Sequence, residues 1–150
     1  MIYIFLIIFL ILIDLISKRY INKKYKINEE KSLYKNKIYI RHIKNEGLAY
    51  GILKNSKKLI YIIVFICTLL VSILFYCAFK ENSKLKKIAF SFALGGALGN
   101  FIERIKNKSI TDFIYIKYKN APIFNFADIF LFISSILLII KEIKDIIIRK

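Results

Sequence analysis

The sequence predicts an all-α polytopic membrane protein with four transmembrane helices and a small β-like subregion in the first loop. Of its 150 residues, 57% are hydrophobic, which is more than a soluble domain of this size can cover with polar groups. Four apolar stretches approach the roughly 20 residues that a helix needs to cross a bilayer. Between the first two stretches, a run rich in β-branched residues follows a strand-like pattern instead.

The four predicted spans cover residues 1–17, 59–79, 88–105 and 123–140. The first stretch has no basic residue before it and no small-residue cleavage site after it, so we interpret it as a retained helix and not as a signal peptide. Cys67 and Cys77 face opposite sides of the second span, which favours apolar fillers over a disulfide. Without a repeat or linker, residues 1–150 are expected to form a single domain.

The segments between the spans are polar and basic. Residues 19–26 mix basic and apolar side chains and are predicted to lie flat on the membrane surface. Residues 38–43 are β-branched with partial alternation, which predicts a short strand or hairpin, and the turn after it carries Gly47 and Gly51. The third loop, 106–122, holds the one proline of the chain.

The net charge of +16 predicts anionic partners. Four lipid-embedded spans favour membrane lipid over nucleic acid as that partner. Lys and Arg are more numerous in the first and third loops than in the second loop and the C-terminal tail. Taken alone, this count would place both termini outside the cell.

Ionisable and amide side chains in or beside membrane spans are costly unless they are paired or functional. In this chain they are Asp14, Asn100, Glu103, Arg104, Asp112, Asn125 and Asp128. Asp14 and Lys18 are spaced i, i+4, which predicts a structural salt bridge on one helix face.

The third span gathers three polar side chains on one face. Asn100, Glu103 and Arg104 have i, i+3, i+4 spacing, and a glycine-rich run before them lets this face approach a neighbouring helix closely. Packing would account for the glycines, and a buried Glu103–Arg104 pair for the charges. Neither accounts for the second polar cluster, Asn125 and Asp128, which opens the fourth span.

Asp112 and Asp128 are placed so that their carboxylates could meet at one face of the bilayer. Repulsion and low dielectric would then raise one pKa, so that the pair holds one proton at neutral pH. One acid can activate a water while the other donates a proton. Two alternatives remain open: a proton-coupled transporter, although four spans without repeats are few for one, and a non-catalytic scaffold in which the acids pair with Arg104 and lysines.

Five sequence blocks narrow this choice. They are DLISK at 14–18, NEGLAYG at 45–51, GGALGNFIER at 95–104, TDF at 111–113 and FNFAD at 124–128. In order and spacing they resemble the lipoprotein signal peptidase, or signal peptidase II, family. The resemblance implies an intramembrane aspartyl protease of the bacterial cytoplasmic membrane, which removes the signal peptide from diacylglyceryl-modified prolipoproteins by cutting just before the lipidated cysteine.

The resemblance also implies roles for individual residues. Asp112 and Asp128 match the catalytic aspartates, and Asp14 and Lys18 match a non-catalytic first motif. The polar shell of the active site is matched by Asn45, Asn100, Arg104 and Asn125, and Gly47 is expected to help to bind the substrate or support the site. Glu103 stands where the family usually has Asp, and Tyr50 where Phe is commoner. Both termini are expected in the cytoplasm and the site near the outer face, against the charge count.

Substrate binding can be predicted from the same segments. An extended substrate needs backbone partners, which the edge of a strand at 38–43, with Asn45 and Gly47 after it, would supply. Its acyl chains would lie in lipid between helices. His42 is the one histidine and is predicted to be a solvated loop residue, so we expect no metal and no cofactor. We expect the protein to be a monomer.

Overall fold

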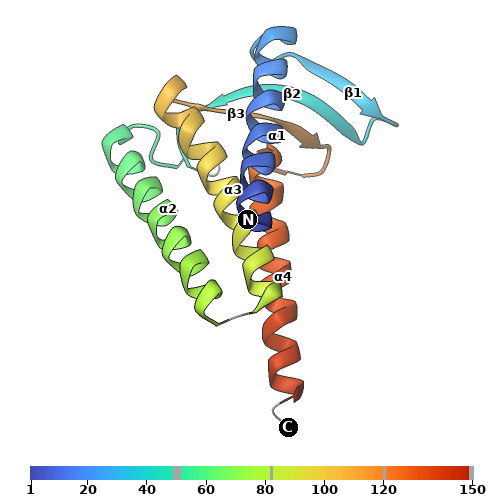
Figure 1. Ribbon diagram of the computed structural model, residues 1–150. Coiled ribbons are helices and arrows are strands. Elements are labelled where there is room, and N and C mark those ends of the chain that lie inside the picture. The colour runs from blue at the N-terminus through green and yellow to red at the C-terminus, as the bar shows by residue number, and fades with distance from the viewer. Residues whose placement is uncertain (49–51, 82, 120, 149–150) are drawn as a thin grey trace.

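The computed structural model describes residues 1–48, 52–81, 83–119 and 121–148, which form a bundle of helices with a small sheet across one end (Figure 1). In chain order the elements are α1 (Ile2–Lys24), β1 (Glu30–Tyr34), β2 (Ile38–Asn45), α2 (Lys57–Lys80), α3 (Lys84–Asn107), β3 (Ile110–Ile116), β4 (Ile123–Phe124) and α4 (Phe126–Ile148). Helix α3 packs against each of the other three helices. The predicted four helices and the β subregion are confirmed.

Helix α1 is longer than its apolar stretch. It continues to Lys24, so the prediction that residues 19–26 lie flat on the membrane as a separate segment is wrong. The reason is packing: Ile21 and Tyr25 extend the inward face of the helix and form a buried cluster with Phe113 of β3. This cluster fixes the end of α1 against the sheet.

The sheet is antiparallel throughout, with the strand order β1-β2-β3-β4. The β1–β2 hairpin confirms the strand predicted at 38–43. Because β2 has β1 on one side and β3 on the other, however, the prediction that 38–43 offers a free edge to substrate is wrong. The edges belong to β1 and to the short β4, which was not predicted as a strand. Strand β3, also not predicted, pairs Asp112 with Ile43 and Thr111 with Lys44.

Glycines set the distance between α3 and its neighbours. A Cβ added at Gly95 would lie 2.8 Å from Cβ of Leu10 on α1, and one at Gly99 would lie 2.5 Å from Oδ2 of Asp14. A Cβ at Gly96 would lie 2.5 Å from the carbonyl oxygen of Ala127 on α4. The predicted close approach of this helix face is therefore confirmed, toward two helices at once.

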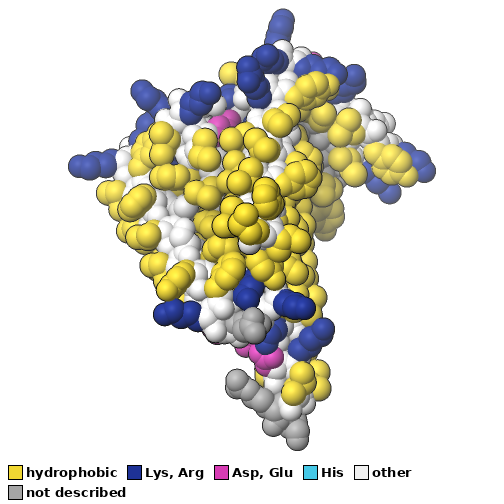
Figure 2. All heavy atoms as spheres, in the orientation of Figure 1, with side chains coloured by type: hydrophobic (Ala, Val, Ile, Leu, Met, Phe, Trp, Pro, Cys, Tyr) yellow, Lys and Arg dark blue, Asp and Glu magenta, His cyan; other side chains and the backbone are white. Residues whose placement is uncertain are grey.

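The outside of the bundle is strongly apolar. Figure 2 shows hydrophobic side chains over the middle of one face and Lys and Arg side chains toward its two ends. Large hydrophobic side chains are exposed on several helices, such as Phe65 on α2 and Phe132 on α4. Among the described helices, α2 is the one that combines the length and the composition of a conventional membrane span. The others carry ionisable residues within or beside their apolar stretches.

We predict that Gly96→Ala destabilises the protein by about 1 to 3 kcal/mol, the usual cost of overpacking. The new methyl group would meet backbone of α4, which can move only with the whole helix. Helix propensity alone would change stability in the opposite direction, by up to about 1 kcal/mol in favour of Ala. Thermal unfolding in detergent separates the two effects, and an unchanged or raised midpoint would contradict the packing described here.

Candidate active site

The start of α4 holds the first carboxylate of the site. The side-chain Oδ1 of Asn125, just before the helix, accepts a hydrogen bond from the backbone N–H of Asp128 at 3.1 Å. In return, Oδ2 of Asp128 accepts one from the backbone N–H of Asn125, also at 3.1 Å. This is a capping box, which satisfies two backbone donors that a helix start would otherwise leave unpaired. The local sequence therefore fixes the Asp128 side chain.

The second carboxylate, Asp112, lies on β3 and is 5% exposed. Its Oδ1 accepts a hydrogen bond from Nδ2 of Asn125 at 2.8 Å, and its Oδ2 accepts one from Nδ2 of Asn45 at 3.1 Å. Asn125 thus contacts both acids. Because β2 and β3 are paired up to Asn45 and Ile110, the sheet places the Asn45 amide beside this carboxylate.

Asn100 on α3 connects the two acids to the rest of the bundle. Its Nδ2 donates to Oδ1 of Asp128 at 3.0 Å, while its Oδ1 accepts from Asn125 at 3.2 Å and from Nζ of Lys18 at 2.7 Å. Each of the four carboxylate oxygens of Asp112 and Asp128 therefore accepts one N–H group. The donors hold the acids in place and leave each oxygen a second lone pair.

Lys18 is buried and neutralised by groups from two helices. Its Nζ lies 2.7 Å from Oδ2 of Asp14 on α1 and 3.3 Å from Oε2 of Glu103 on α3. The predicted Asp14–Lys18 salt bridge is confirmed. The other oxygen of Asp14 accepts the backbone N–H of Ala127 at 3.0 Å, so this acid also caps the first turn of α4.

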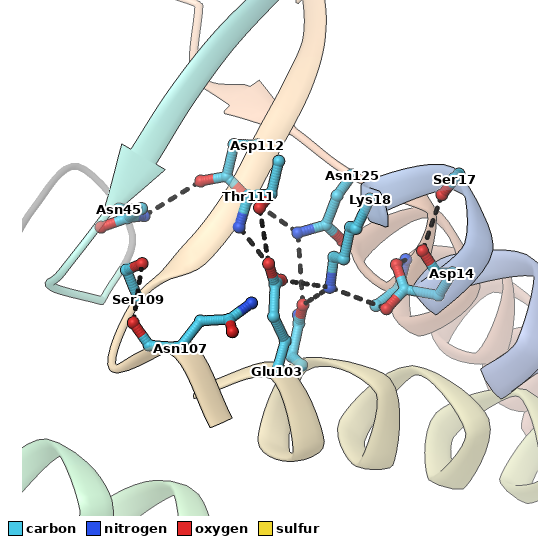
Figure 3. A network of polar contacts seen from close by, with 12 residues as sticks. Asp14, Ser17, Lys18, Asn45, Glu103, Asn107, Ser109, Thr111, Asp112 and Asn125 are labelled. Atoms are coloured by element: carbon cyan, nitrogen blue, oxygen red, sulfur yellow. Dashed lines mark hydrogen bonds and ion pairs between the residues drawn. The ribbon is translucent and has the colours of Figure 1, made fainter. Parts of the chain in front are cut away.

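The alternative in which Glu103 and Arg104 form a buried pair is not observed, because each side chain makes a separate contact. Glu103 accepts hydrogen bonds from the backbone N–H of Thr111 at 3.0 Å and from its hydroxyl at 2.5 Å, next to Asp112 (Figure 3). Arg104 instead donates to the carbonyl oxygen of Gly47 at 2.5 Å. Consecutive residues on a helix point about 100° apart, so the two side chains diverge. Tyr50 and Gly51 lie outside the described residues.

The prediction that His42 is a solvated loop residue is wrong, because it lies on β2 and is 2% exposed. Its Nδ1 is 2.9 Å from the carbonyl oxygen of Tyr25, and its Nε2 is 3.1 Å from Oδ1 of Asn22. Asn22 also donates to the Thr111 hydroxyl at 3.0 Å. His42 therefore joins the end of α1 to the sheet behind Asp112.

Sequence reasoning did not single out Asn22 and Lys44, and it named Thr111 only as part of the TDF block at 111–113. Lys44 on β2 donates to the Thr111 hydroxyl at 2.8 Å. The i, i+4 spacing of Lys18 and Asn22 would have indicated Asn22, had the first helix been extended beyond residue 17. Lys44 and Thr111 are adjacent only through strand pairing, which the sequence pattern did not reveal.

A cavity of about 580 Å³ opens in front of the two acids. Asp112, Asp128, Asn45, Asn100, Arg104 and Asn125 form its polar wall. The opposite wall is apolar and includes Ile63, Val64 and Val71 of α2. The cavity can accept a largely apolar ligand and present its polar end to both carboxylates.

The environment of Asp112 favours its protonated form. Burial, and next the charge of Asp128, raise the pKa of Asp112 from 3.8 to about 6, while hydrogen bonds from Asn45 and Asn125 oppose the rise. Such a pair can hold one proton near neutral pH and exchange it with a bound water.

Comparison with known proteins agrees with this geometry. The family model of signal peptidase (SPase) II matches residues 6–144. The lipoprotein signal peptidase of Clostridium tetani is 36% identical over 138 residues, which cover 90% of this chain and 88% of that protein.

Two solved structures described as bacterial membrane enzymes, determined by the in meso method, are also similar. The one at 2.3 Å resolution superposes with a TM-score of 0.88 at 31% identity, over 99% of this chain and 91% of the other. The one at 1.9 Å resolution gives a TM-score of 0.83 at 31% identity, over 95% and 93%. The chain belongs to the signal peptidase II family, which confirms the resemblance and makes it a bacterial membrane peptidase, not a transporter or a scaffold.

We predict that the pKa of Asp112, near 6 in the unchanged protein, falls in an Asp128→Asn variant but stays above 3.8. Removing the neighbouring charge lowers it, whereas burial, the larger cause, remains. Asn125→Leu should raise it further, because the carboxylate loses a donor. Infrared titration of the carboxyl stretch measures the pKa of Asp112, and the Asp112→Asn variant assigns the band. An unchanged pKa in the Asp128→Asn variant would contradict the proposed electrostatic effect of Asp128 on Asp112.

Proposed function

We propose that this chain is an intramembrane aspartyl endopeptidase that removes the signal peptide from diacylglyceryl-modified prolipoproteins and cuts just before the lipidated cysteine. The observation that carries the proposal is the pair Asp112 and Asp128, bridged by Asn125 on the wall of a largely apolar cavity. Family membership supports the substrate, and the name of the Clostridium tetani relative agrees with it.

In the proposed reaction the two acids divide the proton work. The carboxylate of Asp128 takes a proton from water, and the oxygen of that water bonds to the scissile carbonyl carbon. Asp112, as the protonated partner, stabilises the carbonyl oxygen by hydrogen bonding. When the C–N bond breaks, the proton held by the pair goes to the leaving amine, and the peptide carboxyl product forms with the water oxygen.

Two groups of side chains would support these acids. Asn45, Asn100 and Asn125 keep both carboxylates oriented through the hydrogen bonds described above. Asp14, Lys18 and Glu103 would act further back, by holding the start of α4 and the Thr111 backbone beside Asp112. Asp14, Lys18 and Glu103 are therefore positioning residues, since none of them contacts the proposed reacting atoms.

Arg104 and Gly47 would form the other side of the proposed active site. Arg104 lines the cavity, and its Nε is buried without a hydrogen-bond partner among the described residues. Nη2 of Arg104 donates a hydrogen bond to the Gly47 carbonyl oxygen, which ties the segment after β2 to α3.

The edge of β4 is our proposed binding site for the substrate backbone, in place of the internal strand β2. Ile123 and Phe124 pair with β3 on one side and line the cavity next to the acids. An extended substrate can add to a free strand edge by main-chain hydrogen bonds. Its acyl chains would then follow the apolar wall of α2.

We also propose that all four helices cross the membrane in a single 150-residue domain that works as a monomer, with both termini in the cytoplasm. The apolar middle and basic ends of the surface in Figure 2 support the spans. A reporter fused after the last residue should be active inside the cell and silent outside. The opposite pattern would place the site at the inner face.

We predict that Asp112→Asn and Asp128→Asn each abolish cleavage of a lipidated precursor peptide by purified protein, while the chain still inserts and accumulates. Asn keeps the size and the hydrogen bonding but has no proton to exchange. Because both acids serve one proton cycle, the double variant should be scarcely worse than either single one. Near-normal cleavage by either single variant would rule out the aspartyl mechanism.

Asp145→Asn is the matched control for that experiment. Asp145 lies on α4, like Asp128, but pairs with Lys141 near the opposite end of the helix. The same chemical change there should leave cleavage unchanged. Glu103→Gln should give a slower or less stable enzyme with measurable turnover, because Glu103 contacts Thr111 and not the reacting atoms.

We predict that cleavage requires the diacylglyceryl group. Burial of acyl chains contributes about 0.8 kcal/mol per CH₂ and would hold the scissile bond at the level of the two acids. Replacing Val64 by Asp on the apolar wall should therefore raise KM for the lipidated peptide. Kinetics on matched lipidated and unlipidated peptides test this, and equal kcat/KM for the two would refute it.

A further inference from the structure

A second hollow of about 520 Å³ lies between α1 and α3, and its lining residues differ from those of the active-site cavity. Its apolar residues are Leu15, Ile16 and Ile102, its exposed basic residues are Arg19, Lys23 and Lys106, and a fourth basic residue, Lys18, is buried. We call it the α1–α3 groove. Along each helix the lining changes from apolar to basic within one turn, at Leu15 and Arg19 on α1 and at Ile102 and Lys106 on α3.

The groove begins where the two helices stop touching closely. Gly95 and Gly99 bring α3 against Leu10 and Asp14 of α1. One turn further along, Glu103 and Lys18 stand between the helices and form the floor of the groove. The two helices therefore approach closely at Gly95 and Gly99, whereas the side chains of Lys18 and Glu103 lie between them at the groove.

The three exposed cations of the groove are not neutralised within the described residues of the chain. No carboxylate among those residues lies within salt-bridge distance of Arg19, Lys23 or Lys106, although ion pairs are found at several other lysines. Glu103, the acid that lines the groove, already contacts Lys18 and accepts two hydrogen bonds from Thr111. The groove therefore presents a concentrated positive charge above an apolar cleft.

We propose that the α1–α3 groove is a binding site for an anionic phospholipid of the membrane, with its phosphate among Arg19, Lys23 and Lys106 and an acyl chain along Leu15, Ile16 and Ile102. Lipid phosphate supplies the missing negative charge, and the acyl chain matches the apolar residues that lie one turn deeper. A diacylglyceryl cysteine carries no phosphate, so the substrate does not satisfy this charge pattern. The inference depends on the proposed placement of α1 and α3 in the bilayer, but not on the peptidase chemistry.

Tryptophan fluorescence tests the site directly, because the chain contains no Trp. Ile16→Trp places a reporter in the groove, and Leu69→Trp places a reference on the exposed surface of α2. Each protein is reconstituted in bilayers that contain brominated phosphatidylglycerol or brominated phosphatidylcholine. We expect stronger quenching by the anionic lipid at position 16 and equal quenching by both lipids at position 69.

The variant Arg19→Gln, Lys23→Gln, Lys106→Gln should then lose the preference at position 16 by at least about fivefold, the contribution of one basic residue near a membrane. The control variant Lys31→Gln, Lys35→Gln, Lys37→Gln removes the same charge from the β1–β2 hairpin and should retain the preference. Equal quenching by both lipids at position 16, or an equal loss in both variants, would overturn the site.

Two further outcomes would also overturn it. Displacement of phosphatidylglycerol by millimolar inorganic phosphate would identify a free-phosphate site in its place. Absence of quenching at position 69 would place the helices outside the bilayer and end both proposals about the membrane. Failure of the dyad experiment alone, with the position 16 preference intact, would reject the peptidase mechanism and leave the lipid site standing.

Discussion

The ammonium group of Lys18 must be neutralised inside the bundle, since a buried charge without partners would cost several kcal/mol. The acceptors that meet it come from α1 and α3, and each of them has a second contact elsewhere. Asp14 reaches the start of α4, Glu103 reaches β3, and Asn100 reaches Asp128. The positions of both proposed catalytic acids therefore depend on the hydrogen bonds and ion pairs that surround the Lys18 ammonium group.

Close helix packing and this polar network depend on each other. Gly99 leaves room for the Asp14 carboxylate, because any side chain there would occupy the same space. Gly96 likewise leaves room for the backbone of Ala127. The N–H group of Ala127 donates a hydrogen bond to the Asp14 carboxylate. The glycines thus do more than bring helices together, as they set the distance at which the hydrogen bonds of the site can form.

Much of this arrangement could be predicted from local spacing. The four apolar stretches located the four helices, and the i, i+4 spacing of Asp14 and Lys18 gave the correct salt bridge. Asn125 and Asp128 were correctly grouped because they stand within one turn. The end of α1 was misplaced because the many charged residues after Ser17 made the segment look solvent-exposed, although Ile21 and Tyr25 are buried.

Contacts that depend on strand pairing could not be predicted in the same way. Strand β3 is buried over its first four residues and lacks the alternation that marks a half-exposed strand, so Thr111 and Lys44 were not recognised as neighbours. For the same reason His42 was expected in solvent, and β2 was assigned the free edge that belongs to β4. Register between distant segments is a tertiary property, and single-sequence patterns carry little of it.

The capping box at Asn125 and Asp128 gives the proposed catalytic carboxylate of Asp128 a second, structural role. Oδ2 of Asp128 completes the first turn of α4, while Oδ1 faces the Asn100 amide. A proton arriving on this group weakens the acceptor on which the helix end relies, and its departure restores it. In the mechanism proposed above, the opening turn of α4 would therefore loosen and tighten once in each round of hydrolysis. Small molecules that lock that turn in one state would stop the enzyme without imitating its peptide.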